Sequence, residues 1–479
     1  MSLAGRLRRA AASLLRRVGA SSLLHRAGVS SLWRRAGVSS LWRRAGAWRE
    51  DQLLRRIALL STGVMAGQAV AVLASPLLTR LYTPQEFGLF AVVTSLSGIL
   101  GTSVGLRYEL AVPSARDEGE AAATVALTML ACAGSALLLL PCVWLAGPAL
   151  AAALGAPAAA PLLWLLPLML LLWGCGQPLV YWSIRRGTFR MNAVNRTLQL
   201  ASQAFGQLAL ALPVGGGLGL TLGYALGYLL RLLHHLWALP AQAWRELRAV
   251  RPGEVARQAR LHWRYPAFSL PSGLLQSAAQ FLPALLLAPL YGPAVAGLFA
   301  LAQRMLDVPI RLLSNTASEA YLGEVARMAP AQVQRVFLRT AKRFTLVGAA
   351  GMAPLLLAGP PLFALAFGEP WRDAGAMVQC LVPVSLARFV VIPISQTLYV
   401  VRRQDLHLAS AALNLAALAL SFLAGWWLGL GPLTTLLIYS LGSSLAWVLY
   451  GLSCWWAVSA HARAAAPVGR DGGEPGAGR

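Results

Sequence analysis

Long runs of apolar residues recur along almost the whole chain between Ile57 and Trp456. Each run holds roughly 20 residues, the length at which a helix crosses the ~30 Å hydrocarbon core of a bilayer. Short polar segments, many with proline or arginine, separate one run from the next. The pattern predicts an all-α integral membrane protein with about twelve transmembrane helices. We place them near residues 57–79, 87–108, 120–146, 160–184, 193–212, 217–239, 268–290, 294–317, 344–366, 374–399, 406–428 and 432–457.

The longest polar connection, at 240–266, divides these helices into two sets of six. Such a division is typical of transporters, in which the substrate path runs between two related halves. We therefore expect an N-terminal lobe at 53–239, a basic cytoplasmic linker at 240–266 and a C-terminal lobe at 267–458. A basic extension at 1–52 precedes them, and the Gly-, Ala- and Pro-rich tail at 459–479 is predicted to be disordered and cytoplasmic.

The basic extension contains a nine-residue tandem repeat, GVSSLWRRA, at 28–36 and again at 37–45. It is too basic and too interrupted for a signal peptide, which needs an unbroken apolar core. One interpretation is a cationic amphipathic helix that lies on anionic membrane lipids. The other is a recent repeat expansion or an over-extended reading frame.

Composition supports the membrane assignment, since 57% of the residues are hydrophobic, only 12% are charged and the mean hydropathy is +0.60. A net charge of +24 would suggest nucleic acid in a soluble protein. Here the arginines gather in every second connection, and the opposite side holds only Arg80 and Arg372. This positive-inside distribution predicts cytoplasmic N- and C-termini and no nucleic-acid partner.

The five cysteines, Cys132, Cys142, Cys175, Cys380 and Cys454, lie within or beside predicted helices, without a CxxC pair or a histidine at ligand spacing. We expect no disulfide, no metal and no cofactor. The chain also lacks a P-loop that could hold a nucleotide.

The turn at 78–88, LTRLYTPQEFG, has a clear local signature. Thr83 at the N-cap, Pro84 at the first helical position and Glu86 at the third predict a capping box that starts the second helix.

That turn and its continuation to Arg107-Tyr108-Glu109-Leu110-Ala111-Val112-Pro113 resemble the opening of the Wzx-type oligosaccharide flippases. These proteins belong to the multidrug/oligosaccharidyl-lipid/polysaccharide exporter superfamily. Further similar stretches follow in order, so the resemblance extends from about Leu53 to Trp456. They are YWSIRRGTFRMNAVNRTLQ at 181–199, the segment from RYPAFSLPSG to LFALAQRML at 264–306, LFALAFGEPWRDAG at 362–375 and PISQTLYVVRRQ at 393–404.

The resemblance implies a twelve-helix, two-lobed flippase of the bacterial cytoplasmic (inner) membrane. Its implied substrate is an undecaprenyl-pyrophosphate-linked oligosaccharide repeat unit, moved from the cytoplasmic to the outer leaflet. The implied partners are membrane lipids and the polysaccharide polymerase and assembly machinery that builds O-antigen lipopolysaccharide, capsule or exopolysaccharide.

A pyrophosphate can enter an apolar protein only where fixed positive charge replaces its water, so arginines within the spans are the candidate binding residues. Arg304, Asp307 and Arg311 are spaced to share one helix face, and Pro309 among them permits a bend. We expect Arg304 and Arg311 to bind the pyrophosphate while Asp307 tunes them or exchanges a proton or sodium ion. The alternative is a neutralised Arg-Asp-Arg cluster that only joins helices.

Four other charged residues are further candidates. Glu319 extends the same face and is a second ion-coupling candidate. Arg388 lies deep in the tenth span, where it either lines a cavity or extends to the cytoplasmic interface. Arg107 is either a substrate contact or a topological anchor, with Glu109 on nearly the opposite helix face. Arg80 either contacts the emerging headgroup or anchors the outer side.

The sixth span also carries charged or titratable residues, namely Arg231, His234 and His235. We expect them at the membrane interface, although the histidines could relay protons.

Two other functions have to be weighed. A membrane polymerase or ligase would present acid and base groups on a long outer loop, and the outer connections here are short, so we expect no enzyme. A drug or small-cation antiporter of the same superfamily would line its cavity with carboxylates and aromatic rings, whereas these spans carry arginines.

Overall fold

The structure is a computed structural model that describes residues 52–325, 328, 330–401 and 403–464. Within these residues the regular secondary structure is entirely helical. Eight of the described helices are long and apolar enough to cross a membrane, and a ninth candidate is bent by 48° at residues 164–165. Each predicted span coincides with a helix or a broken run of helices, which confirms the all-α membrane fold. The repeats at 28–45 and the end of the predicted tail lie outside the described residues.

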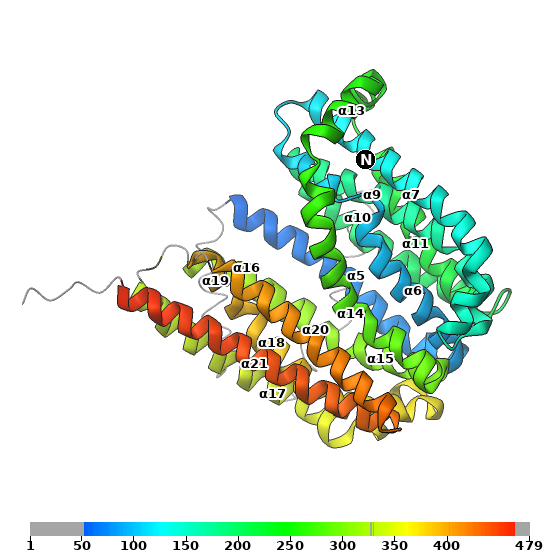
Figure 1. The fold of residues 1–479 in the computed structure, drawn as a ribbon, viewed down its shortest axis with the longest axis vertical. Coiled ribbons are helices and arrows are strands. Elements are labelled where there is room, and N and C mark those ends of the chain that lie inside the picture. The colour runs from blue at the N-terminus through cyan, green and yellow to red at the C-terminus, as the bar shows by residue number, and fades with distance from the viewer. Residues whose placement is uncertain (1–51, 326–327, 329, 402, 465–479) are drawn as a thin grey trace, which may run out of the picture. The chain divides into compact units, whose positions relative to one another are not determined.

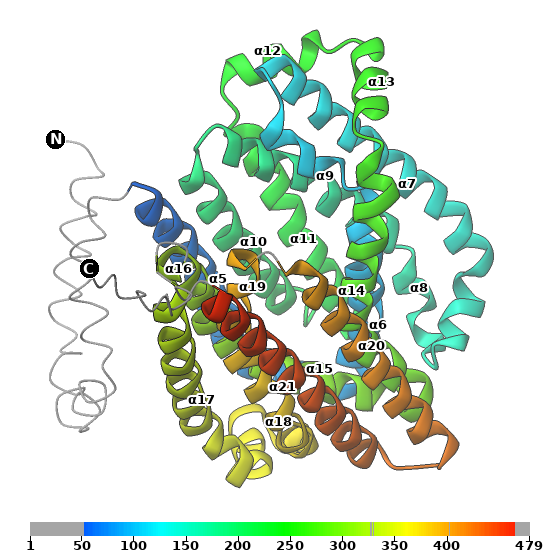
Figure 2. The ribbon, with the colours of Figure 1, turned by 60° about the vertical axis from the view of Figure 1, so that its left-hand side comes forward.

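The first six spans are long helices with short breaks, followed by two linker helices. The linker helices α12 and α13 pack against the first turns of α7 (Figure 2). The elements are α5 (Gln52–Leu81), α6 (Pro84–Val104), η2 (Tyr108–Ser114), α7 (Glu118–Ala153), η3 (Pro157–Ala159), α8 (Ala160–Leu163), α9 (Leu166–Arg185), α10 (Phe189–Ala209), α11 (Gly216–Trp237), α12 (Ala241–Ala249) and α13 (Pro252–Leu261).

The second six spans contain two π-helical turns, at 265–269 and 310–314. The elements are η4 (Tyr265–Ser269), α14 (Leu270–Tyr291), α15 (Pro293–Pro309), η5 (Ile310–Ser314), α16 (Asn315–Val325), α17 (Pro330–Phe367), η6 (Glu369–Trp371), α18 (Arg372–Ser395), α19 (Thr397–Val400), α20 (Gln404–Trp427) and α21 (Pro432–Ala464).

Two groups of helices pack within residues 61–464, and α14 and α15 contact both. Helices α7, α9 and α11 belong to one group, and α17, α18 and α21 to the other (Figure 1). Helix α14 packs against α6 and α20, while α15 packs against α6 and α18. The assignment of residues 53–239 and 267–458 to two lobes stays a prediction.

The predicted capping box is present at the start of α6. The backbone N–H of Thr83 donates to Oε2 of Glu86 at 2.7 Å, and the backbone N–H of Glu86 donates to Oγ1 of Thr83 at 3.4 Å. Pro84 occupies the first turn, where its missing N–H costs nothing. The capping box fixes where α6 begins.

Helices α6 and α15 cross with their backbones almost in contact. A Cβ atom on Gly88 would lie 1.7 Å from the carbonyl oxygen of Pro293, and one on Gly297 would lie 2.0 Å from that of Pro84. Small residues allow such close packing of membrane helices. Nearby, the indole N–H of Trp371 donates to the carbonyl of Thr79 at 2.9 Å. These contacts join the first and second halves of the chain.

Candidate substrate cavity

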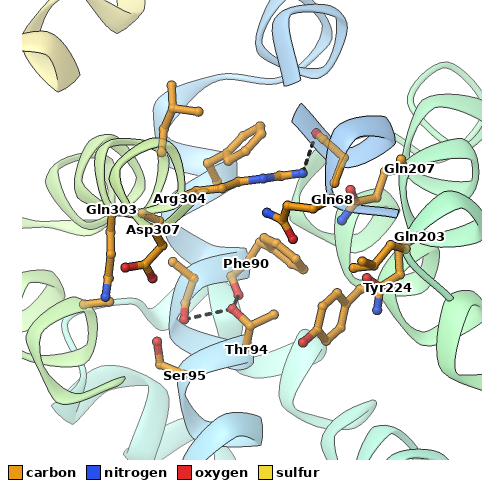
Figure 3. Close-up of a pocket in the computed structure, with 18 of the residues that line it drawn as sticks. Gln68, Phe90, Thr94, Ser95, Gln203, Gln207, Tyr224, Gln303, Arg304 and Asp307 are labelled. Atoms are coloured by element: carbon orange, nitrogen blue, oxygen red, sulfur yellow. Dashed lines mark hydrogen bonds between the residues drawn. The ribbon is translucent and has the colours of Figure 1, made fainter. Parts of the chain in front are cut away.

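A cavity of about 310 Å³ lies between helices of the first half and helices of the second half (Figure 3). Its walls come from α5, α6, α10, α11, α14 and α15, and polar side chains point into it from most of these helices. The lining includes Gln68, Thr94, Arg196, Gln199, Gln203, Tyr224, Gln280, Gln303, Arg304, Asp307 and Arg311.

Three of the predicted site residues, Arg304, Asp307 and Arg311, line this cavity together on α15 and the π turn that follows it. The regular α-helix ends at Pro309 and a π-helical turn begins at the next residue, while a bend at this position stays a prediction. Whether these side chains bind a substrate stays a prediction. The side chain of Glu319 lies outside the described residues.

Asp307 is held by two arginines. Nη1 of Arg388 lies 3.3 Å from Oδ1, and Nη2 of Arg311 lies 3.6 Å from Oδ2. Asp307 is buried with 8% of its surface exposed, so this pairing offsets the cost of removing its charge from water. We refer to Arg311, Asp307 and Arg388 as the carboxylate cluster. It resembles the neutralised cluster considered from the sequence, but Arg388 occupies the place expected for Arg304, and Arg388 itself is outside the cavity lining.

Arg304 points away from the carboxylate cluster and toward α5. Its Nη2 donates to the carbonyl oxygen of Ala71 at 2.8 Å, as Figure 3 shows. That carbonyl also accepts a hydrogen bond from the hydroxyl of Ser75 at 2.8 Å. Among the described residues no carboxylate pairs with Arg304, so its charge is available to the cavity.

The α10 side of the cavity carries a polar stripe that our sequence reasoning missed. Asn192, Asn195, Gln199, Gln203 and Gln207 recur every three or four residues, which places them on one helix face. All five side chains are buried. This spacing is visible in the sequence, and amides in an otherwise apolar span were the signal that could have identified the site.

Two arginines converge on one amide of this stripe. Oε1 of Gln199 accepts hydrogen bonds from Nη1 of Arg196 at 3.2 Å and from Nη1 of Arg231 at 3.1 Å. We refer to Arg196, Gln199 and Arg231 as the amide cluster. The interfacial position expected for Arg231 is wrong, because only 6% of its surface is exposed and it lies between α10 and α11.

The neighbouring histidines also pair with the polar stripe. Nδ1 of His234 lies 2.5 Å from Oδ1 of Asn195, and Nε2 of His235 lies 3.3 Å from Oδ1 of Asn192. His235 is fully buried. The interfacial position expected for His235 is therefore also wrong.

Glycines on α11 make room for the stripe. Gly219, Gly223 and Gly227 recur every fourth residue, and a Cβ atom on Gly227 would lie 2.2 Å from Cγ of Gln203. One on Gly223 would lie 2.4 Å from the backbone nitrogen of Gln207. This small-residue pattern brings the two helices close together and positions the amides at the cavity wall.

The remaining predicted residues lie outside the cavity lining. Arg80 is exposed at the end of α5. Arg107 and Glu109 were expected on opposite faces of a helix, and this is wrong. Helix α6 ends at Val104, and Leu106 and Arg107 adopt left-handed φ angles of 52° and 63°. The helix therefore ends before Arg107, and Nη1 of Arg107 lies 3.8 Å from Oε1 of Glu109.

The chain is similar in fold to solved structures of a flippase and of transporters. The chain matches the lipid II flippase MurJ in an inward closed conformation with a TM-score of 0.66 and 12% identity, over 85% of this chain and 90% of that one. It matches an inward-facing multidrug resistance MATE transporter with a TM-score of 0.55 and 14% identity, over 84% and 95%. It matches a transporter of the MOP superfamily from Pyrococcus furiosus with a TM-score of 0.50 and 16% identity, over 85% of this chain and 96% of that one.

The chain therefore shares its fold with a lipid II flippase and with a multidrug resistance transporter. The profile of the family described as "Polysaccharide biosynthesis protein" matches residues 77–376, more than half of the chain. The chain therefore belongs to that family, and the resemblance seen in the sequence motifs is confirmed. The structural neighbours named above are a flippase and transporters rather than enzymes. No curated protein shows significant sequence similarity to it.

Proposed function

We propose that this protein flips an undecaprenyl-pyrophosphate-linked oligosaccharide repeat unit from the cytoplasmic to the outer leaflet of a bacterial inner membrane. The delivered unit would then pass to the polymerase and assembly machinery of a surface polysaccharide such as O-antigen or exopolysaccharide. The positive-inside distribution supports cytoplasmic N- and C-termini. Two lobes, residues 53–239 and 267–458, would move relative to one another around the cavity.

The charge of the cavity lining carries this proposal. Arg196, Arg304 and Arg311 line it, against the single carboxylate of Asp307, which Arg311 and Arg388 already pair. Unpaired cations in a low-dielectric environment are costly, and an anionic ligand removes that cost. Arginine also binds phosphate oxygens with several donors at once. A pyrophosphate fits these properties.

The family and the fold support the proposal without identifying the substrate. The family concerns polysaccharide biosynthesis, and one protein with the same fold is a lipid II flippase. Export of a cationic drug is the alternative, since other structural neighbours are multidrug transporters. The arginine-rich lining argues against a cationic cargo, because like charges repel.

Ion coupling at Asp307 is compatible with this geometry. Its carboxylate would accept a proton or sodium ion only after an arginine leaves it. A pyrophosphate that draws Arg311 into the cavity would do this, because Arg311 is the more distant partner at 3.6 Å. Substrate binding and ion binding would then be linked through one side chain.

The test is charge reversal of Arg304 in the native host. Arg304→Glu should abolish surface polysaccharide and leave undecaprenyl-linked oligosaccharide on the cytoplasmic leaflet, with unchanged protein level. Arg304→Lys should retain part of the activity, because it keeps the charge and loses donors. Arg116→Glu, an exposed site outside the cavity, is the control. Normal polysaccharide in Arg304→Glu, or drug resistance without a polysaccharide phenotype, would contradict the proposal.

A further inference from the structure

We propose that the α10 wall of the cavity is the subsite for the sugar, and that Gln199 presents a fixed hydrogen-bond donor to it. This inference rests on the proposed function and adds which part of the substrate each wall binds. The α15 wall, with Arg304 and Arg311, would hold the pyrophosphate. Arg231 would act as a positioning residue that fixes the orientation of Gln199.

The orientation of the Gln199 amide follows from its partners. A guanidinium group only donates hydrogen bonds, so the atom that accepts from both Arg196 and Arg231 must be the amide oxygen. Both lone pairs of that oxygen are then used. The amide cannot rotate by 180° without placing its own N–H groups against two arginines. Its NH₂ group, which has no recorded partner among the described residues, remains to donate to a ligand.

Gln203, one turn further along α10, provides a second donor. Its Nε2 is buried without a hydrogen-bond partner, and only 8% of the residue is exposed. Gln199 and Gln203 both line the cavity. Figure 3 shows Gln203 in its wall. Buried donors in native proteins normally have a partner, so an unpartnered one in a cavity wall is free to donate to a ligand atom or to a water molecule.

The chemistry of this wall suits a saccharide. Neutral amide N–H groups match the hydroxyl and carbonyl oxygens of a sugar, whereas guanidinium groups match phosphate. Aromatic rings flank the amides: Tyr224 packs edge-on against Phe90 at 5.5 Å, and its hydroxyl lies 2.9 Å from that of Tyr228. Rings with hydroxyl tips provide both an apolar surface and a polar contact for a sugar ring.

Arg231 acts only through Gln199. It is buried outside the cavity lining, on the far side of the amide, and no carboxylate among the described residues pairs with it. Removing it would leave the Gln199 oxygen with one donor in place of two. The amide would then lose its single orientation, and the sugar would lose a pre-positioned donor.

The experiment compares two probes on purified protein in lipid nanodiscs. The first is undecaprenyl pyrophosphate, which has no sugar, and the second is undecaprenyl-pyrophosphoryl N-acetylglucosamine. Gln199→Met and Gln203→Met should each weaken binding of the sugar-bearing probe about tenfold and leave the sugar-free probe unchanged. Arg304→Met should weaken both probes. Gln379→Met, an amide outside the cavity, should change neither.

Arg231 is tested by a double-mutant cycle. Arg231→Met should lower the affinity ratio of the two probes as Gln199→Met does, and the double variant should lose no more than either single one. A purely structural role would weaken both probes together. Gln203→Met is the variant that is expected to fold normally. Its amide nitrogen has no hydrogen-bond partner among the described residues, so the substitution breaks no such bond there.

The outcomes separate the two levels of the proposal. An unchanged ratio in Gln199→Met and Gln203→Met, with the wild type binding both probes, would overturn the sugar subsite and leave the flippase proposal standing. Failure of the wild type to bind either probe would overturn the proposed function and the subsite together.

Discussion

The carboxylate cluster and the amide cluster have the same arrangement of side chains but different net charges. In each, two arginines converge on the end of one side chain, which is Asp307 in the first and Gln199 in the second. The carboxylate cluster combines one negative with two positive charges. The amide cluster has two positive charges and none to offset them among the described residues. The first therefore keeps one net positive charge, and the second keeps two.

This difference shows that the number of arginines in a membrane span is a poor guide to a binding site. What matters is whether the acceptor between them is charged. A paired carboxylate stabilises the fold and offsets one of the two positive charges. A neutral amide satisfies the geometry of the guanidinium groups but leaves their charge in place. Exchanging the two acceptors should exchange these properties.

Gln199→Glu should have the largest effect, because it converts the amide cluster into a second carboxylate cluster. A negative charge about 6 Å from a bound anion, at an effective dielectric near 20, costs about 3 kcal/mol, or roughly a hundredfold in affinity. Binding of undecaprenyl pyrophosphate to the purified variant measures this. Equal affinity in variant and wild type would show that the anion lies far from α10.

Asp307→Asn is the converse change. It leaves Arg311 and Arg388 without a carboxylate, and we expect the free energy of unfolding to fall by about 2 to 3 kcal/mol. Unfolding in mixed detergent micelles, followed by tryptophan fluorescence, is the measurement. The double variant Gln199→Glu with Asp307→Asn restores the net charge, and it should recover anion binding relative to Gln199→Glu alone. Unchanged stability in Asp307→Asn would mean that the cluster contributes nothing to the fold.

Gly227→Ala tests how tightly the amide cluster is held. The added methyl would lie 2.2 Å from Cγ of Gln203 and 2.6 Å from the carbonyl of Gln199, so α10 and α11 must separate. We expect a loss of about 2 kcal/mol in unfolding free energy. Gly351→Ala on α17 is the matched control, since beyond the adjacent backbone of its own helix no atom of the described residues lies within 4 Å of the new methyl. Similar stabilities for the two variants would show that the close packing is unimportant.

Arg388→Lys should have the smallest effect. Lysine keeps the charge that faces Asp307 but loses the planar guanidinium, and Arg311 still pairs the carboxylate. We expect a change of about 0.5 kcal/mol in stability and no change in anion binding. A large loss of polysaccharide export in this variant would give Arg388 the direct substrate role considered from the sequence.

Features that depend on local chemistry were predictable from the sequence. The Thr83 capping box needs only residues within one turn, and Pro309 disrupts its own helix whatever lies around it. The spans themselves follow from bilayer thickness and hydropathy. These features define the fold class and place Arg304, Asp307 and Arg311 on the cavity.

Which groups pair with each charged side chain was not predictable from the sequence in the same way. Arg304 could pair with Asp307 on its own helix, yet it donates to Ala71 because α5 packs there. Arg388 reaches Asp307 from a helix 81 residues along the chain. Leu106 and Arg107 adopt left-handed φ angles that most side chains avoid. Neither residue type predicts this conformation from the sequence. Such choices depend on which helices become neighbours.

The crossing of α6 and α15 has a consequence for how this family can vary. At Gly88 and Gly297 there is no space for even one additional carbon atom, because the nearest obstacle is backbone and cannot change rotamer. Nineteen of the twenty amino acids are thus excluded at each position unless the helices separate. Glycine is therefore the residue that both positions require for the two helices to pack this closely.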